Sequence, residues 1–74
     1  MSIHENKLII LKRKQVEAIT GLSRSTIYSK IETGTFPKPI KLSERSVGWL
    51  ESEVQEWITE RINISRSIDR KAVK

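Results

Sequence analysis

Polar and basic side chains crowd the segment TGLSRSTIYSK, residues 20–30. Between Leu22 and Lys30 the only aliphatic residue is Ile27, and the other side chains carry hydroxyl groups or a positive charge. A helix that served packing alone would not need these groups. Arginine can hold guanine through two hydrogen bonds, and hydroxyl groups can bond to bases or phosphates, so the segment has the chemistry to recognise DNA. The candidates are Ser23, Arg24, Ser25, Thr26, Tyr28, Ser29 and Lys30.

These candidates have different possible roles besides contact with DNA. Ser23 is expected to cap the N-terminus of a helix, whatever else the segment does. For Arg24 we favour a contact with DNA, whereas Ser25 and Ser29 are open to DNA contact or to simple solvation. Thr26 is expected to face the neighbouring helix or to support the turn. The ring of Tyr28 suits the edge of the core, from which its hydroxyl could reach a phosphate.

Further basic candidates lie before and after this segment. Lys12, Arg13 and Lys14 fall at the start of a predicted helix, where cations oppose the helix dipole. Phosphate contact would explain that placement, and a solvated run of charge is the alternative. Lys41 and Arg45 fall in a predicted hairpin, which could lay a basic tip along the DNA backbone or into a minor groove.

The elements that position these residues follow from apolar spacing and from glycine. A short helix is predicted over residues 12–20, and Gly21 ends it, as is typical of a glycine after the last helical turn. A second helix begins after Ser23 and stops near Gly34. The connection of about three residues is that of a helix-turn-helix. The apolar residues expected to fill the angle between the helices are Val16, Ile19, Leu22, Ile27 and Ile31.

The second half of the chain predicts a hairpin and a last helix. Residues 40–42 and 47–49 flank the sequence SERS and suit two short strands. A helix is expected from about Glu51, and Trp49 and Trp57 are expected in the core because each lies in an apolar pattern. The order helix, tight turn, helix, hairpin, helix predicts a mainly α fold with a small β-hairpin, which is a winged helix-turn-helix.

The organisation expected along the chain is one small domain with two flanks. Residues 1–7 are predicted to be a flexible leader, residues 8–62 the folded domain, and residues 63–74 a basic tail that is disordered or only partly helical. Within the domain, the sequence KLIIL at residues 7–11 predicts either a short strand or an extended segment that plugs the core.

Composition narrows the function classes. The net charge is +5, and residues 12–41 hold seven basic side chains against two acidic ones, which indicates a face offered to a polyanion. His4 is the only histidine, Asp69 the only aspartate, and there is no cysteine. No catalytic set, cofactor loop or metal-ligand spacing can be assembled from these residues, so we expect neither an enzyme nor a cofactor. No segment is apolar over the ~18 residues that a membrane span needs.

The segments GLSRSTIY, FPKPIKL and VGWLESEVQEWI occur in this order, and the chain resembles the AlpA family of prophage-encoded regulators from about Leu11 to Ile62. The wider group is similar to phage excisionases and to the DNA-binding domain of MerR-type regulators. The resemblance implies that the second helix reads the major groove and that Lys41 and Arg45 belong to the wing. It also implies regulation of an integrase gene, action as an excision factor, or both.

The leading hypothesis is therefore sequence-specific binding of double-stranded DNA without catalysis. Self-association on DNA and contact with an integrase are further expectations, and the expected location is the cytoplasm, at the nucleoid. The rival hypothesis is a protein-interaction module, such as an antirepressor that binds a repressor or an integrase instead of DNA. A steep loss of affinity with salt would favour DNA, because binding to several phosphates releases their counterions.

Overall fold

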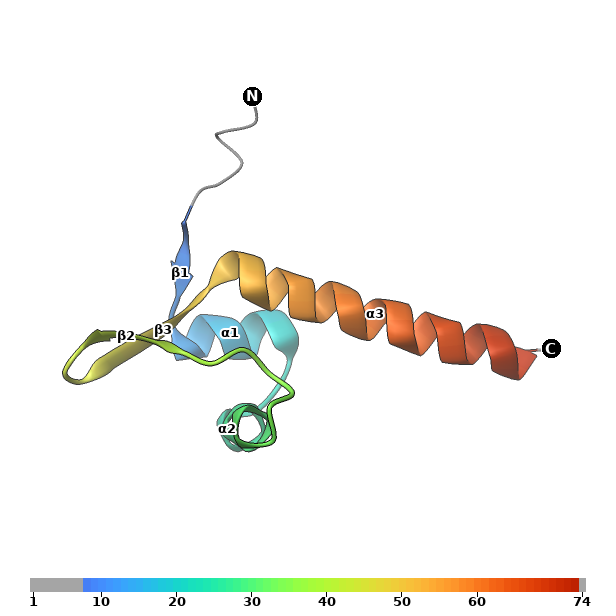
Figure 1. Ribbon diagram of the computed structural model, residues 1–74, viewed down its shortest axis with the longest axis horizontal. Coiled ribbons are helices and arrows are strands. Elements are labelled where there is room, and N and C mark those ends of the chain that lie inside the picture. Colours follow the sequence, from blue (N-terminus) through green and yellow to red (C-terminus); the bar gives the residue numbers. More distant parts are fainter. Residues whose placement is uncertain (1–7, 74) are drawn as a thin grey trace, which may run out of the picture.

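The computed structural model describes the backbone of residues 8–73 and the side chains of residues 8–67. The predicted leader, residues 1–7, lies outside the described residues. In Figure 1, α1 lies between α2 and the long helix α3, and the hairpin of β2 and β3 projects away from the helices. This order confirms the predicted winged helix-turn-helix. The elements are β1 (Ile10–Leu11), α1 (Arg13–Thr20), α2 (Arg24–Glu32), β2 (Ile40–Ser43), β3 (Ser46–Leu50) and α3 (Glu51–Val73).

The three strands form one antiparallel sheet in the order β1-β3-β2. Ile10 pairs with Leu50, and Ile40 pairs with Gly48. Ile10 and Leu11 of the apolar stretch before α1 therefore form a short strand, the first of the two predicted alternatives for that stretch. Gly48 lies in the middle strand, where a Cβ atom would overlap Cγ2 of Ile10 and lie 3.1 Å from Cδ1 of Leu42. The side chains of Ile10 and Leu42 therefore occupy the space over β3 that a side chain at position 48 would need.

The core gathers one residue from nearly every element. Trp49 is fully buried, and its Nε1 donates a hydrogen bond to the carbonyl oxygen of Pro37 at 3.0 Å. Trp57 is half-buried against the core, and its Nε1 donates to the carbonyl oxygen of Thr35 at 2.7 Å. Both indoles thus pin the loop between α2 and β2, and both are core residues as expected. The buried apolar residues are Leu11, Val16, Ile27, Phe36, Trp49 and Val54.

Ile19 is a correction to the predicted packing between α1 and α2. Its side chain is 44% exposed, whereas Val16 is fully buried. Three residues turn a helix by roughly 300°, so Ile19 lies about 60° round the helix from Val16 and away from the core. Leu22 and Ile31 do pack against the core, and both are half-buried.

The last helix extends into the region predicted to be a basic tail. Helix α3 runs to Val73, so the described backbone of residues 63–73 is helical. Residues 51–73 contain neither glycine nor proline, which are the residues that most strongly end helices. In the described part of the chain, no helix is long and apolar enough to cross a membrane.

Candidate nucleic-acid interface

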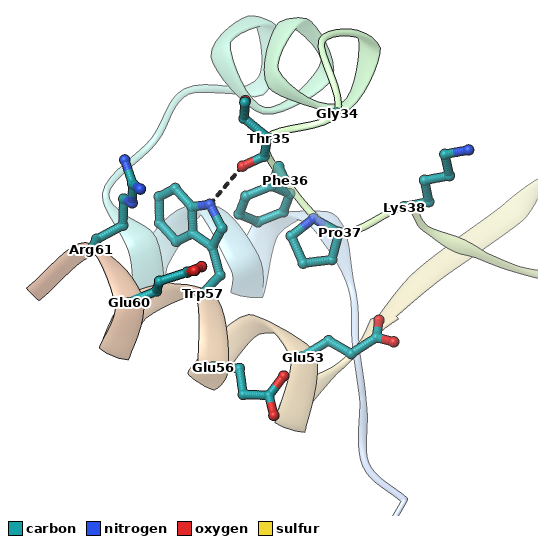
Figure 2. Close-up of a pocket in the computed structure, with 10 residues that line it drawn as sticks. All are labelled: Gly34, Thr35, Phe36, Pro37, Lys38, Glu53, Glu56, Trp57, Glu60 and Arg61. Carbon is teal, nitrogen blue, oxygen red and sulfur yellow. Dashed lines mark hydrogen bonds between the residues drawn. The ribbon is translucent and has the colours of Figure 1, made fainter. Parts of the chain in front are cut away.

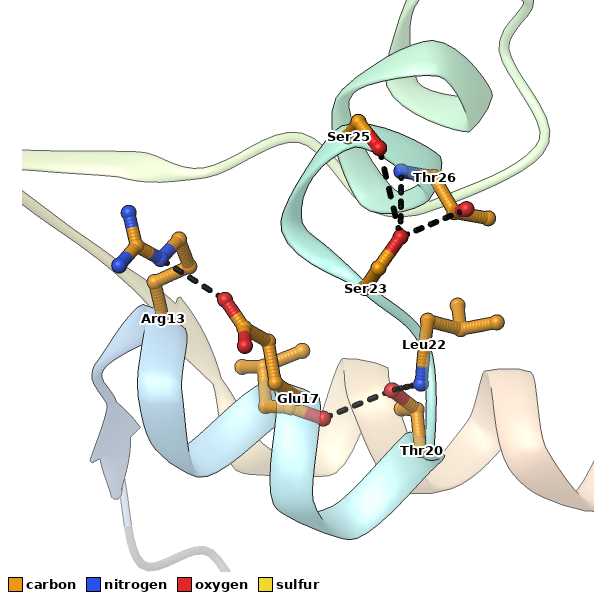
Figure 3. A network of polar contacts seen from close by, with 8 residues as sticks. Arg13, Glu17, Thr20, Leu22, Ser23, Ser25 and Thr26 are labelled. Carbon is orange, nitrogen blue, oxygen red and sulfur yellow. Dashed lines mark hydrogen bonds and ion pairs between the residues drawn. The ribbon is translucent and has the colours of Figure 1, made fainter.

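The turn between α1 and α2 is held by its own backbone and one threonine. Gly21 adopts φ 78°, in the left-handed region that glycine favours, and its N–H donates to the carbonyl oxygen of Glu17 at 2.8 Å. The hydroxyl of Thr20 donates to the carbonyl oxygen of Val16 at 2.7 Å and accepts from the N–H of Leu22 at 3.2 Å (Figure 3). The start of α2 is therefore fixed relative to α1.

Ser23 caps α2, as predicted. Its Oγ accepts a hydrogen bond from the backbone N–H of Thr26 at 3.2 Å and donates to Oγ1 of Thr26 at 2.9 Å. Oγ of Ser25 lies 3.4 Å away, so three hydroxyl groups meet at the helix start (Figure 3). Thr26 supports the turn, which was one of its two predicted roles. A phosphate at this end of α2 would therefore find the backbone N–H of Thr26 already bonded to Ser23.

Ser25 and Ser29 lie on the outermost face of α2. Each lies roughly 160° round the helix from the buried Ile27, since each residue advances the helix by about 100°. Both serines are exposed. The structure thus offers two hydroxyl groups, four residues apart, to whatever approaches this helix.

Arg24 and Tyr28 form a second row on α2, on the flank next to the sheet. The guanidinium carbon of Arg24 lies over the ring of Tyr28, 5.9 Å from its centroid. The Tyr28 ring in turn meets Trp49 edge to face, with centroids 6.3 Å apart and an interplanar angle of 64°. Tyr28 is 38% exposed, so its ring is at the edge of the core as predicted. Arg24 is therefore linked through one ring to strand β3.

Lys30 lies on the other flank of α2, beside Thr26, and both are half-buried. Lys30 is the basic residue of the last turn, where a cation complements the helix dipole. Its carbonyl oxygen accepts from the N–H of Thr35 at 2.8 Å and from the hydroxyl of Thr33 at 3.1 Å. This network accounts structurally for the backbone of Lys30, and DNA contact by its side chain stays a prediction.

The three cations that begin α1 have different surroundings. Nζ of Lys12 donates to Oγ of Ser46 at 3.2 Å, which joins the start of α1 to the turn end of the hairpin. Nε of Arg13 forms an ion pair with Oε2 of Glu17 at 3.0 Å, so its charge is partly offset (Figure 3). Lys14 is exposed. Lys12 and Lys14 are consequently better suited to phosphates than Arg13.

The hairpin presents its basic residues to solvent. Strand β2 is exposed along its whole length, and Lys41 pairs with Val47 of β3. Arg45 lies with Glu44 in the turn between the strands, at the tip of the projecting hairpin (Figure 1). The structure therefore places Arg45 at the end of the wing and Lys41 along its edge.

Another concave surface lies between α3 and the loop of residues 34–38 (Figure 2). Its lining includes Glu53, Glu56 and Glu60. The guanidinium carbon of Arg61 lies over the Trp57 ring, 5.8 Å from the ring centroid. Three carboxylates would repel a phosphate backbone, so this acidic groove is distinct from the candidate interface. Sequence reasoning did not predict the groove, although the spacing of the glutamates along one helix was visible.

A three-residue turn, a capped second helix with polar rows facing outward and a projecting hairpin together define a winged helix-turn-helix protein. Residues 9–62 match the family described as Prophage CP4-57 regulatory protein (AlpA). The chain belongs to this family of prophage regulatory proteins.

Two relatives show how far the similarity extends. The chain is 46% identical over 52 residues to ORF88 of Enterobacteria phage P4, a match covering 70% of this chain and 59% of the phage protein. It is 38% identical over 61 residues to the DNA-binding transcriptional activator AlpA of Escherichia coli strain K12, covering 74% of this chain and 87% of that protein. The chain therefore spans less than two thirds of the phage protein and most of the bacterial one.

Proposed function

We propose that this chain binds double-stranded DNA at specific sequences and regulates transcription of a prophage or integrative element. The observation that carries the proposal is the outer surface of α2, where Arg24 lies over Tyr28 beside the exposed hydroxyls of Ser25 and Ser29. In a helix-turn-helix the first turns of the second helix enter the major groove. Arg24 would bond to guanine, and the serines would bond to bases or phosphates.

Residues outside α2 would hold the protein on the DNA backbone. Lys12 and Lys14 at the start of α1 and Lys41 on the hairpin are exposed cations, and Arg45 occupies the hairpin tip. Contacts with phosphates fix orientation and raise affinity without selecting a sequence. The hairpin would act as a wing along the backbone or in a minor groove.

The more specific part of the proposal concerns the target. The E. coli relative is named a DNA-binding transcriptional activator, and we extend that role to this chain. The target would be the promoter of an integrase gene, the attachment site of the element, or both, and the protein would act at the nucleoid in the cytoplasm. Contact with the integrase itself and self-association on DNA are parts of the same proposal.

The test is binding to DNA of the protein's own element against random duplex of equal length, at several salt concentrations. We expect a preference for the element's DNA and an affinity that falls steeply with salt. Nuclease footprinting across the integrase promoter and attachment site would then separate the two targets. Protection of the promoter alone supports regulation, and repeated protected sites beside the attachment core support excision.

The competing function is that of an antirepressor which binds a repressor or integrase in place of DNA. It would bind its protein partner without any preference between the element's DNA and random duplex. Absence of that preference in the intact chain would overturn the proposed function.

A further inference from the structure

The part of α3 from Ile62 to Ser67 contributes no side chain to the core. Trp57 and Ile58 are the last residues of α3 that pack against the core. Every side chain from Thr59 to Ser67 is exposed, including Ile62 at 39% and Ile64 at 42%. Figure 1 shows α3 continuing well past α1 and α2. Since helices in proteins owe most of their stability to tertiary packing, this exposed stretch would gain stability from a partner.

Charge is divided along the same helix. Residues 51–60 include four glutamates and no basic residue, whereas residues 61–73 include four basic residues and one aspartate. The helix dipole favours acids in the first turn and bases in the last turn, but its effect falls off within those turns. Glu56, Glu60 and Arg66 lie too far inside α3 for the dipole to explain them. A partner with the opposite order of charge would explain them.

These charges share one face of α3. At about 100° per residue, Glu56, Glu60 and Arg66 fall within an arc of roughly 120° on the helix surface. By the same spacing, Ile62 and Ile64 flank this face on its two sides. A helix laid along the face would therefore meet acidic groups at one end, basic groups at the other and an isoleucine on each side.

The acidic half of α3 also lines a groove. Glu53, Glu56 and Glu60 form one side, and the loop of residues 34–38 forms the other (Figure 2). Trp57 lies among these residues, with Arg61 of the same helix folded over its ring. Lys38 and Arg61 also line the groove, so its three carboxylates leave an excess of negative charge that suits the basic half of a second helix.

We propose that α3 pairs antiparallel with α3 of a second copy of this chain. The acidic half of each helix would then lie along the basic half of the other. The two-fold axis would pass where the acidic half of each helix meets its basic half, and Ile62 and Ile64 would lie at the sides of the contact. A parallel pair would bring glutamates against glutamates. The antiparallel pair is closed and self-complementary, so it satisfies both halves of the helix at once.

This dimer does not depend on DNA binding, and it adds to the proposed function if both hold. Two copies related by a two-fold axis would present two α2 helices. The preferred DNA site would then be an inverted repeat whose half-site spacing matches the distance between the helices.

Sedimentation equilibrium of the intact protein in the absence of DNA tests the pairing. We expect a mass that rises with concentration from 8.6 kDa towards twice that value. Two variants reverse charge on opposite halves of α3: Glu56→Lys with Glu60→Lys, and Arg66→Glu with Arg70→Glu. Each should raise the dissociation constant roughly tenfold to thirtyfold, because several exposed ion pairs become like-charge contacts. Circular dichroism of each variant verifies that it remains folded.

Mixing the two variants gives the decisive result. In a mixed antiparallel pair, the introduced lysines of one chain face the introduced glutamates of the other, and the two unaltered halves face each other with their native charges. The mixture should therefore dimerise about as well as the native protein, although each variant alone does not. Glu44→Lys, which changes charge on the hairpin, is the matched control and should leave dimerisation unchanged.

Three outcomes would overturn the proposal. The native protein could remain a monomer at all concentrations, which would leave the exposed half of α3 to another protein or to DNA. The reversed variants could dimerise as the native protein does, which would place any dimer contact elsewhere. The mixture could fail to recover while both variants remain folded, which would exclude antiparallel pairing of these charges. None of these results would affect the preference for element DNA that tests the proposed function.

Discussion

The guanidinium of Arg24 lies over the ring of Tyr28, with Cζ 5.9 Å from the ring centroid. The same ring meets the buried Trp49 edge to face at 6.3 Å. A long exposed arginine loses rotamer freedom when it binds, and a ring beneath it reduces that cost by holding it partly in place. The position of Arg24 on α2 is thus tied to the core through one tyrosine.

Replacing Arg24 with alanine should weaken binding to the preferred DNA site by about 1–3 kcal/mol, the range for a bidentate arginine–guanine contact. The affinity for random duplex should fall less, so the difference in affinity between the preferred site and random duplex should become smaller. Arg24→Lys keeps the charge but loses the planar guanidinium group. Compared with Arg24→Ala, it should restore the affinity for random duplex more than it restores the sequence preference. Titrations of both duplexes at one salt concentration measure these differences.

Arg61 provides the matched control for Arg24. It lies over the Trp57 ring at 5.8 Å, close to the distance in the Arg24–Tyr28 pair, but on α3 beside the acidic groove. Arg61→Ala removes the same charge and a similar stacking contact. On a duplex that holds a single half-site, it should leave the sequence preference unchanged. An equal loss of preference in the two variants would contradict a reading role for Arg24.

Ser23→Ala should destabilise the fold by about 1 kcal/mol, with a range of roughly 0.5–2, because it removes the cap of α2. The lost contacts are the bonds to the backbone N–H and the hydroxyl of Thr26. Urea unfolding followed by circular dichroism measures this change. Ser25→Ala is the control, since Ser25 makes only the long 3.4 Å contact with the cap. A Ser25 variant as unstable as the Ser23 variant would show that the cap is not the source of the loss.

The local parts of the fold could be predicted from sequence because their causes are local. Gly21 ends α1 through its own φ, and Ser23 caps a helix through an N–H three residues away. The hairpin likewise follows from two apolar runs around a polar turn. Each of these signals lies within a few residues of the structure that it predicts.

The parts that sequence reasoning missed or left open depend on residues far apart in the chain. The sequence left open whether the stretch before α1 forms a strand, and the pairing of Ile10 with Leu50 makes Ile10–Leu11 a strand. The exposure of Ile19 depends on where α2 and α3 cover α1, which helical spacing alone does not specify. Nor could spacing show that Lys12 would reach Ser46 of the hairpin. The exposed polar rows of α2 were predictable, but the ring that holds Arg24 beside Trp49 was not.

Arg45→Ala should weaken DNA binding and reduce the slope of log affinity against log salt by about one, as expected for one lost phosphate contact. Arg45 lies at the tip of the hairpin, beside Glu44. The loss should be similar on preferred and random duplex, since a backbone contact carries no sequence information directly. Glu44→Gln gives the opposite test in the same turn: it removes a charge that repels phosphate and should tighten binding slightly. An unchanged salt slope for Arg45→Ala would remove the hairpin tip from the interface.

Gly48→Ala should destabilise the protein by about 1–3 kcal/mol through overpacking of the sheet. The new Cβ would overlap Cγ2 of Ile10 and lie 3.1 Å from both the carbonyl oxygen of Leu11 and Cδ1 of Leu42. Since Ile10→Ala removes the overlapping methyl group, the double variant should be more stable than the sum of the single effects by roughly 0.5–3 kcal/mol. Urea unfolding of all four proteins gives this coupling.

Gly21→Ala separates steric overlap from backbone strain. Gly21 has φ 78°, and a Cβ atom there would have no neighbouring atom within 4 Å. Alanine at this position should therefore cost about 1–3 kcal/mol through strain alone. That cost should not change when Ile10 is replaced by alanine, because no contact joins the two sites. The effects of Gly21→Ala and Ile10→Ala are thus expected to add. If the effects of Gly48→Ala and Ile10→Ala also add, Gly48 is not required for the close approach of β1 and β2 across β3.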